Sequence, residues 1–293
     1  MANLKEVKSR IQSVNSTKQI TKAMKMVAAA KLRRAQDRII RMRPYAQKLS
    51  KIILNVSSGQ TKDVENPYFE VRKVGRVLLV VVSSDRGLCG AFNSSIFKYT
   101  RNLIFEKYAE IESPGDLDIL PIGKKSYEFF KKRNYNVIEG YAHLLEKLNF
   151  DDSRRTAEMI IEKFEKSTYD KVEIIFNEFK NVATQIIKNE QFLPVSDINQ
   201  NERGAESDYI FEPSKDVIFN DLLPRFLKIR FYKTLLESNA SEHGARMTAM
   251  DKATENADEL LKDLRLTYNR TRQAAITKEI LEIVGGAEAL AQG

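Results

Sequence analysis

An apolar stripe that recurs in alternating steps of three and four residues is the strongest constraint on this fold. It begins at Leu4 and continues to Val56, and thirteen of its sixteen positions are apolar. This spacing is the 3.5-residue period of a coiled coil. A helix of this length measures about 80 Å, which exceeds the diameter of any domain that the chain can form, so it must protrude. The sixteen positions are Leu4, Val7, Ile11, Val14, Lys18, Thr21, Lys25, Ala28, Leu32, Ala35, Ile39, Met42, Ala46, Leu49, Ile53 and Val56.

A second stripe with the same spacing runs through the C-terminal third of the chain. It extends from Met247 to Ala275 and then shifts by one position to Ile276, Ile280 and Ile283. We therefore expect a second long helix from about 221 to 289, antiparallel to the first because both adjoin the same central segment. Its excess length of about 15 residues, or ~20 Å, lies at the C-terminus. An apolar stripe without a partner in its own chain predicts burial by another subunit.

Between the two stripes, short apolar runs alternate with helical patterns. This alternation predicts a small, Rossmann-like α/β domain with a partly parallel sheet. We expect the chain to divide into an N-terminal helix (1–57), an α/β domain (58–212) and a C-terminal helix (213–293). The expected strands are Arg76–Val82, Leu117–Ile122, Tyr135–Ile138, Lys171–Glu178, Thr184–Lys188 and Tyr209–Phe211, and the expected helices are Ala91–Ile111, Lys124–Arg133 and Ser153–Ser167.

The charge of the chain is concentrated at its N-terminus. The net charge is +8, but residues 1–51 hold 14 lysines and arginines against two acids, Glu6 and Asp37. Such a basic arm predicts an acidic partner: nucleic acid, anionic lipid or an acidic protein surface. No apolar run reaches the ~20 residues that cross a bilayer, so we expect attachment to a membrane only through partners.

The residues that most enzymes and metal sites need are scarce. Cys89 is the single cysteine, which excludes an internal disulfide and a cysteine-based zinc site. The two histidines, His143 and His243, lie a hundred residues apart. We therefore expect no catalytic residue, no metal and no cofactor on this chain.

Four motifs resemble one known family, the gamma subunits of rotary F-type ATP synthases. They lie in order along essentially the whole chain, so coincidence does not explain them. The motifs are IQSVNSTKQITKAMKMVAAAK (Ile11–Lys31), SSDRGLCGAFN (Ser83–Asn93), EHGARMTAMDKATENA (Glu242–Ala257) and RQAAITKEILEIVGGAEA (Arg272–Ala289).

The resemblance implies a mechanical role rather than a catalytic one. In that family the coiled coil is the central shaft inside a ring of alternating alpha and beta subunits, which hold the nucleotides. The α/β domain lies outside the ring, against the epsilon subunit and the c ring of the membrane sector. The resemblance thus implies a non-catalytic rotor subunit of a proton- or sodium-driven synthase. It would lie on the cytoplasmic face of a bacterial inner membrane and bind no nucleic acid.

The resemblance also implies contact residues at the positions that match the family motifs. Met24 and Lys25 match the level at which the shaft meets an acidic lever of a beta subunit, with Arg246 and Met247 on the facing helix. Further positions match a catch loop of a beta subunit and the polar loops of the c ring. They are Arg272, Gln273, Thr277, Glu279 and Glu282 for the catch loop, and Tyr209 and Glu212 for the c ring.

Two motifs also have plainer interpretations. Lys18, Lys22 and Lys25 span two turns of one helical face, which in an arbitrary protein is usually a solvated face. The segment Ser83–Gly90 follows an apolar strand and precedes a helix, so its backbone N–H groups could hold a phosphate. Its spacing matches neither the dinucleotide fingerprint nor a P-loop, which favours a tight turn. Cys89 in that turn is interpreted as a packed small side chain.

Two other functions compete with the shaft. A nucleic-acid-binding coiled coil would explain the basic arm, although residues 1–51 hold only one aromatic residue, Tyr45, for stacking on bases. A nucleotide-handling enzyme would use the turn at Ser83–Gly90, although no carboxylate, histidine and phosphate loop assemble in the sequence.

Overall fold

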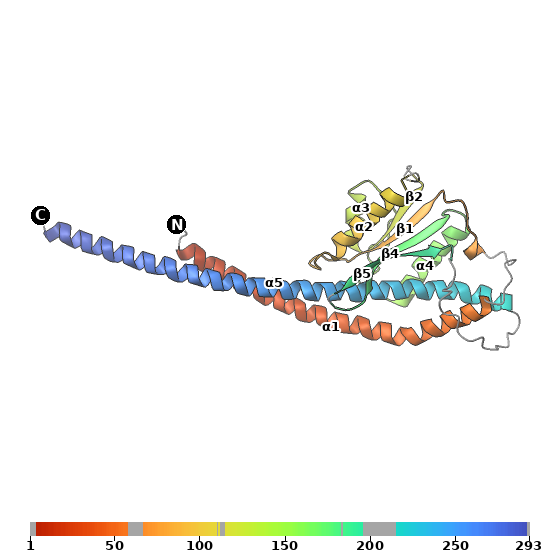
Figure 1. The fold of residues 1–293 in the computed structure, drawn as a ribbon, viewed down its shortest axis with the longest axis horizontal. Coiled ribbons are helices and arrows are strands. Elements are labelled where there is room, and N and C mark those ends of the chain that lie inside the picture. The colour runs from red at the N-terminus through yellow and green to blue at the C-terminus, as the bar shows by residue number, and fades with distance from the viewer. Residues whose placement is uncertain are drawn as a thin grey trace. The chain divides into compact units, whose positions relative to one another are not determined.

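The computed structural model describes residues 4–57, 67–109, 111, 115–182, 184–195 and 215–291. The chain divides into two compact units. The first unit combines Met1–Val27 with Met247–Gly293, and the second is Ala28–Arg246. Two long helices, α1 (Leu4–Ser57, 54 residues) and α5 (Lys215–Ala291, 77 residues), each contribute to both units (Figure 1). The two predicted long helices are therefore confirmed, and α5 is the longer.

The N-terminal stripe is the face that α1 buries. In the first unit Val7 and Thr21 are buried, and in the second unit Ala28 and Leu32 are buried. The apolar stripe of α5 is likewise buried or half-buried from Met247 to Leu264. Its buried members in the first unit are Met250, Ala257, Leu261 and Leu264.

Polar contacts fix the direction and register of α1 against α5 in the first unit. Lys18 forms an ion pair with Asp258, and Lys25 forms one with Asp251. In both pairs the residue numbers add to 276, so one number rises as the other falls and the helices are antiparallel. The same register sets Leu4, the first described residue, level with Arg272. The last turns of α5 therefore extend beyond the described part of α1.

The second unit is built on a mixed five-stranded sheet of order β3-β2-β1-β4-β5. The first four strands are parallel, and β5 runs antiparallel to β4 at the edge. A parallel sheet covered on both faces needs continuous apolar strands, and all six residues of β1 are buried. The strands are β1 (Val77–Val82), β2 (Leu117–Ile122), β3 (Asn136–Val137), β4 (Lys171–Phe179) and β5 (Gln185–Leu193).

Helices cover both faces of this sheet, so the second unit has three layers (Figure 1). Because side chains alternate across a strand, β1 supplies Leu78 and Val80 to one core and Val77 and Leu79 to the other. The helices α2 (Phe92–Lys107) and α3 (Lys124–Lys131) pack on the second core, and α4 (Phe150–Glu165) packs on the first together with parts of α1 and α5. Their buried side chains are Ile96, Phe97, Ile104 and Phe130 on one face, and Leu49, Ile53, Ile160, Phe164, Leu227, Phe231 and Leu235 on the other.

The expected elements differ from the observed ones mainly at their ends. The strand expected at Thr184–Lys188 continues to Leu193, and α5 begins at Lys215 and includes Pro224. The strand expected at Tyr209–Phe211 lies outside the described residues. Within the described ranges, no helix combines the length and apolarity that crossing a membrane requires.

Candidate interaction surfaces

The free end of α5 is an exposed helix with an apolar stripe. Ile276, Ile280 and Ile283 are 48%, 54% and 72% exposed, and Leu281 and Val284 are also exposed. Apolar side chains gathered on one exposed helix end mark a surface that another molecule covers. The exposure agrees with the stripe that the sequence left without a partner.

All five residues matched to the catch-loop contact lie on this exposed end. They make only local contacts within the described chain: the Thr277 hydroxyl donates to the Gln273 carbonyl (3.0 Å), and Lys278 lies 3.5 Å from Glu282 one turn away. Their polar groups therefore remain accessible to a partner. The five residues are Arg272, Gln273, Thr277, Glu279 and Glu282.

Met24 and Lys25 lie in the coiled coil of the first unit. Both side chains are half-buried, and the Lys25 ammonium forms an ion pair with Asp251. The Lys25 side chain retains 39% exposure, so it is still partly accessible to solvent. The lysines that interrupt the apolar stripe are therefore seam residues with partners across the helix pair, and Lys22 is the exposed one.

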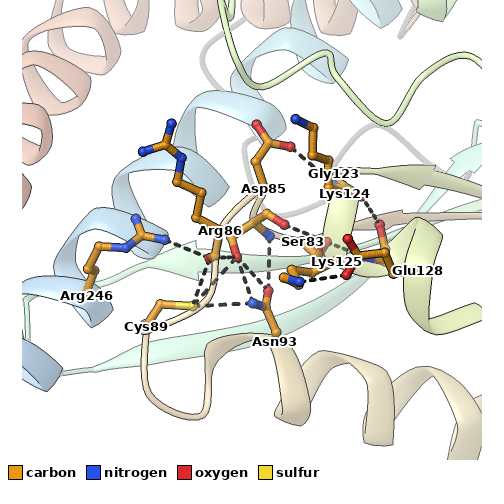
Figure 2. A network of polar contacts seen from close by, with 12 residues as sticks. Ser83, Asp85, Arg86, Cys89, Asn93, Gly123, Lys124, Lys125, Glu128 and Arg246 are labelled. Atoms are coloured by element: carbon orange, nitrogen blue, oxygen red, sulfur yellow. Dashed lines mark hydrogen bonds and ion pairs between the residues drawn. The ribbon is translucent and has the colours of Figure 1, made fainter.

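Arg246, another predicted contact residue, is largely enclosed by its own chain. Its side chain is only 12% exposed, and its Nη1 lies 2.6 Å from an oxygen of Glu242, one turn earlier on α5. Its Nη2 donates to the carbonyls of Arg86 (2.9 Å) and Gly87 (3.3 Å) in the turn after β1 (Figure 2). The guanidinium thus fastens a turn of the α/β domain to the helix.

The turn after β1 caps the N-terminus of α3, and the backbone N–H of Ser84 in this turn donates to the Asn93 side chain (3.0 Å). Asp85 accepts a hydrogen bond from the backbone N–H of Lys124 (3.1 Å), at the first residue of α3 (Figure 2). The Ser83 hydroxyl accepts from the N–H of Ser126 (2.8 Å). The positive end of α3 is therefore already filled by a carboxylate and a hydroxyl. This geometry favours a structural turn over a nucleotide site.

Two side chains of types that catalysis often uses, Cys89 in this turn and His243 on α5, are buried and uncharged at neutral pH. Burial raises the pKa of the Cys89 thiol, and only a thiolate is a strong nucleophile. Burial and the nearby positive charge of Arg246 lower the pKa of His243 to about 4. Cys89 packs against Phe92 and Ala245, as expected of a small core residue. Among the described residues, no group of acidic, histidine or cysteine side chains could hold a metal ion.

Comparison with known proteins decides the family. Residues 3–290 match a family model described as ATP synthase. The chain is 58% identical to the ATP synthase gamma chain of Cytophaga hutchinsonii, over 99% of both sequences. The chain belongs to the ATP synthase gamma-chain family. It is also 51% identical to the gamma chain of Amoebophilus asiaticus over the full length of both.

Solved structures agree with this assignment. A chain of the Tetrahymena thermophila mitochondrial ATP synthase, solved as central stalk and c ring, is 25% identical, with a TM-score of 0.55. The match covers 80% of this chain and 99% of that one. A chain of the Euglena gracilis mitochondrial rotor has the same fold, with a TM-score of 0.64, 21% identity and coverage of 93% and 98%. This member of the family is accordingly a non-catalytic subunit of the central stalk, the rotor of F-type ATP synthase.

The structure also shows which residues of this gamma-family chain the sequence reasoning missed. Glu242 and Asn93 each anchor a contact of the turn after β1, and neither was singled out. A signal for Glu242 existed, because a glutamate four residues before Arg246 predicts an ion pair on one helix face. Tyr209 and Glu212 lie outside the described residues.

Proposed function

We propose that this chain is the shaft that couples rotation of the c ring to the conformational cycle of the catalytic beta subunits in an ion-driven ATP synthase. The observation that carries the proposal is the exposed apolar end of α5, which extends past the described part of α1. Burial of such a stripe inside a ring of partner subunits removes apolar surface from water without needing one fixed angle, because the hydrophobic effect is non-directional.

The proposed functional division follows the three segments of the sequence. Residues 1–57 and 213–293 form the shaft that the alpha and beta subunits surround, and residues 58–212 form the domain that meets the epsilon subunit and the c ring. The complex lies on the cytoplasmic face of a bacterial inner membrane, and this chain reaches the membrane only through its partners. In support, a related Euglena chain was solved with OSCP, F1 and the c ring, and the gamma chains cited above are bacterial.

The exposed polar residues at the free end provide the angle-dependent part of the contact. Arg272 and Gln273 are exposed and bind a loop of a beta subunit through directional hydrogen bonds. Thr277, Glu279 and Glu282 complete this surface. A guanidinium bound to a partner loop in one orientation must be released before the shaft turns, which links rotation to the state of that subunit.

A second contact lies further along the shaft. Met24, Lys25 and Met247 are half-buried side chains at the level where an acidic lever of a beta subunit approaches, and Arg246 precedes Met247 in sequence. The positive charge on the partly exposed Lys25 side chain attracts the acidic partner. Tyr209 and Glu212 are proposed to contact the polar loops of the c ring.

Two measurements test this function. The chain is tagged in the α/β domain and purified gently from membranes; we expect it with two larger nucleotide-binding subunits, each in excess over this chain. In that complex, Arg272→Ala with Gln273→Ala lowers ATP-driven ion pumping, whereas Arg225→Ala on the same helix does not. Recovery of the chain with nucleic acid and without such subunits contradicts the proposal.

A further inference from the structure

The turn that follows β1 is held in a strained shape by contacts on both sides. Leu88 has a φ of 62°, in the left-handed region that non-glycine residues avoid, and its side chain is 64% exposed. A strained residue of this kind persists only where its surroundings fix it. Gly90, two residues later, has a φ of 60° at less cost because it lacks a Cβ.

One side of the turn is fixed by its own side chains. The Ser84 hydroxyl lies 2.6 Å from the carbonyl oxygen of Arg86, and the Asn93 amide donates to that hydroxyl at 2.7 Å. The backbone N–H of Ser84 donates in turn to the Asn93 side-chain carbonyl (3.0 Å). In Figure 2 the Asn93 side chain points toward the turn that contains Arg86 and Cys89. These side chains orient the Arg86 carbonyl, and further hydrogen bonds from the N–H groups of Lys124 and Lys125 hold the turn to α3.

Arg246 fixes the other side and is the hydrogen-bonded link to α5, next to the apolar contact of Cys89 with Ala245. It donates from Nη1 to Glu242 and from Nη2 to the Arg86 and Gly87 carbonyls. The Glu242 side chain is 8% exposed and the Arg246 side chain 12%, so these charge-assisted bonds are shielded from water. A lysine at 246 carries one nitrogen on a flexible stem and cannot reproduce this fork.

The location of this link matters for a rotating part. Arg246 is the last residue of the second unit, and α5 continues without interruption as Met247 into the first unit. The chain also passes between the two units within α1, at Val27–Ala28, so Arg246 lies at one of two helical connections. A link here reduces independent movement of the turn against the helix.

We propose that Arg246 is a positioning residue that locks the turn at Arg86–Cys89 onto α5, so that the α/β domain and the helix turn together. This inference rests on the proposed function. It gives Arg246 an internal role that differs from direct charge contact with a partner subunit, and the two roles can be separated by substitution.

The experiment uses the assembled complex and compares Arg246→Ala, Arg246→Lys and Arg225→Ala with the parent. Arg225 is a matched control because it also pairs with a carboxylate one turn earlier on α5, at 2.9 Å from Asp221, but is exposed. Cys89, the single cysteine of the chain and buried in the turn, reports locking through its rate of maleimide labelling. Coupling is measured as the membrane potential formed per ATP hydrolysed, which responds to proton and sodium pumping alike.

Locking predicts that Arg246→Ala and Arg246→Lys both raise the Cys89 labelling rate, by about tenfold, because loss of charge-assisted bonds makes local opening easier. Both variants also lower the coupling ratio, and Arg225→Ala changes neither. Labelling that stays at the Arg225→Ala rate in both variants overturns the lock. Full coupling in Arg246→Lys shows that charge alone suffices and also overturns it. A parent complex that does not pump contradicts the proposed function instead, while the labelling result still decides whether the turn is locked.

Discussion

The hydroxyl oxygens of Thr21 and Thr254 lie 2.8 Å apart in the seam between α1 and α5. The pair is flanked on either side by the ion pairs Lys18–Asp258 and Lys25–Asp251. Polar residues at seam positions specify the register of a coiled coil, because any shift separates donors from acceptors. The interruption in the apolar stripe is thus a polar layer that fixes how the two helices are aligned.

A double-mutant cycle on Thr21 and Thr254 tests whether the two hydroxyls stabilise the helix pair together. Each hydroxyl also lies within hydrogen-bond distance of a backbone carbonyl of its own helix, Lys18 for Thr21 (3.0 Å) and Met250 for Thr254 (2.7 Å). Because a hydroxyl carries one proton, one threonine donates to the other across the seam while the second donates to its own helix. We expect Thr21→Val to lower the free energy of unfolding by about 1 kcal/mol. Thr21→Val with Thr254→Val should cost less than the sum of the two single variants, since no polar group is left without its partner. Urea unfolding monitored by circular dichroism measures both, and strictly additive values contradict the coupling.

Gly123 should tolerate no side chain. A Cβ there would lie 2.4 Å from the carbonyl oxygen of Ser83, and its φ is +99°. Gly115 has a similar φ of +109° but open space around it, so it isolates the cost of the backbone conformation. We expect Gly115→Ala to cost about 1–2 kcal/mol of stability, and Gly123→Ala to cost ~2 kcal/mol more because of the overlap. Equal urea midpoints for the two variants would contradict this assignment.

Glu173 should make the stability of the chain depend on pH. Its side chain is 2% exposed, and it lies 2.5 Å from the Lys107 ammonium and 3.2 Å from that of Lys171. Burial alone would raise the pKa of Glu173, but hydrogen bonds from Lys107 and Asn189 and the Lys107 charge outweigh it and hold the pKa below its usual range. A lowered folded-state pKa gives stability that is present above the unfolded value of ~4.3 and is lost as the pH falls through the folded value.

Glu173→Gln removes the pH-dependent contribution of this carboxylate to stability. We expect the variant to be about 1–3 kcal/mol less stable near neutral pH, and the difference from the parent to shrink as the pH falls below ~4. The measurement is urea unfolding across that pH range. Glu162→Gln, at an exposed carboxylate paired with Lys166, is the control and should match the parent at neutral pH. A Glu173→Gln difference that does not change with pH excludes the carboxylate as its source.

Periodicity predicted the long helices because burial follows it over many turns. The stripe from Leu4 to Ile53 is buried or half-buried at every position. The same method ended β5 too early, at Lys188, because the polar residues Asn189, Glu190 and Gln191 follow. As an edge strand with half-exposed residues, β5 accommodates polar side chains that a central strand does not.

The contacts of the candidate surfaces were harder to predict than the helices. Periodicity marked Lys18 and Lys25 as interruptions, but their partners lie 240 and 226 residues away, and only the fold brings them together. Motif matching gave Arg246 a contact with a partner subunit, which stays a prediction, and it did not reveal that the guanidinium contacts the turn after β1. Exposed residues such as Arg272 and Gln273 were easier to recognise, because their position on the free end of α5 follows from helix length alone.

The central claim is that the free end of α5 works as a shaft surface inside a ring of partners. Ile280→Asp tests it most directly, because this side chain is 54% exposed and a charge there should change the stability of the chain by less than ~0.5 kcal/mol. Phe105→Asp, at a 77% exposed apolar residue of α2, is the matched control. ATP synthesis is measured in membranes in which each variant replaces the parent chain. We predict that Ile280→Asp lowers the rate by about fivefold or more, since burying an unpaired carboxylate against apolar partners is costly, while Phe105→Asp retains it. Equal rates for Ile280→Asp, Phe105→Asp and the parent would contradict the account.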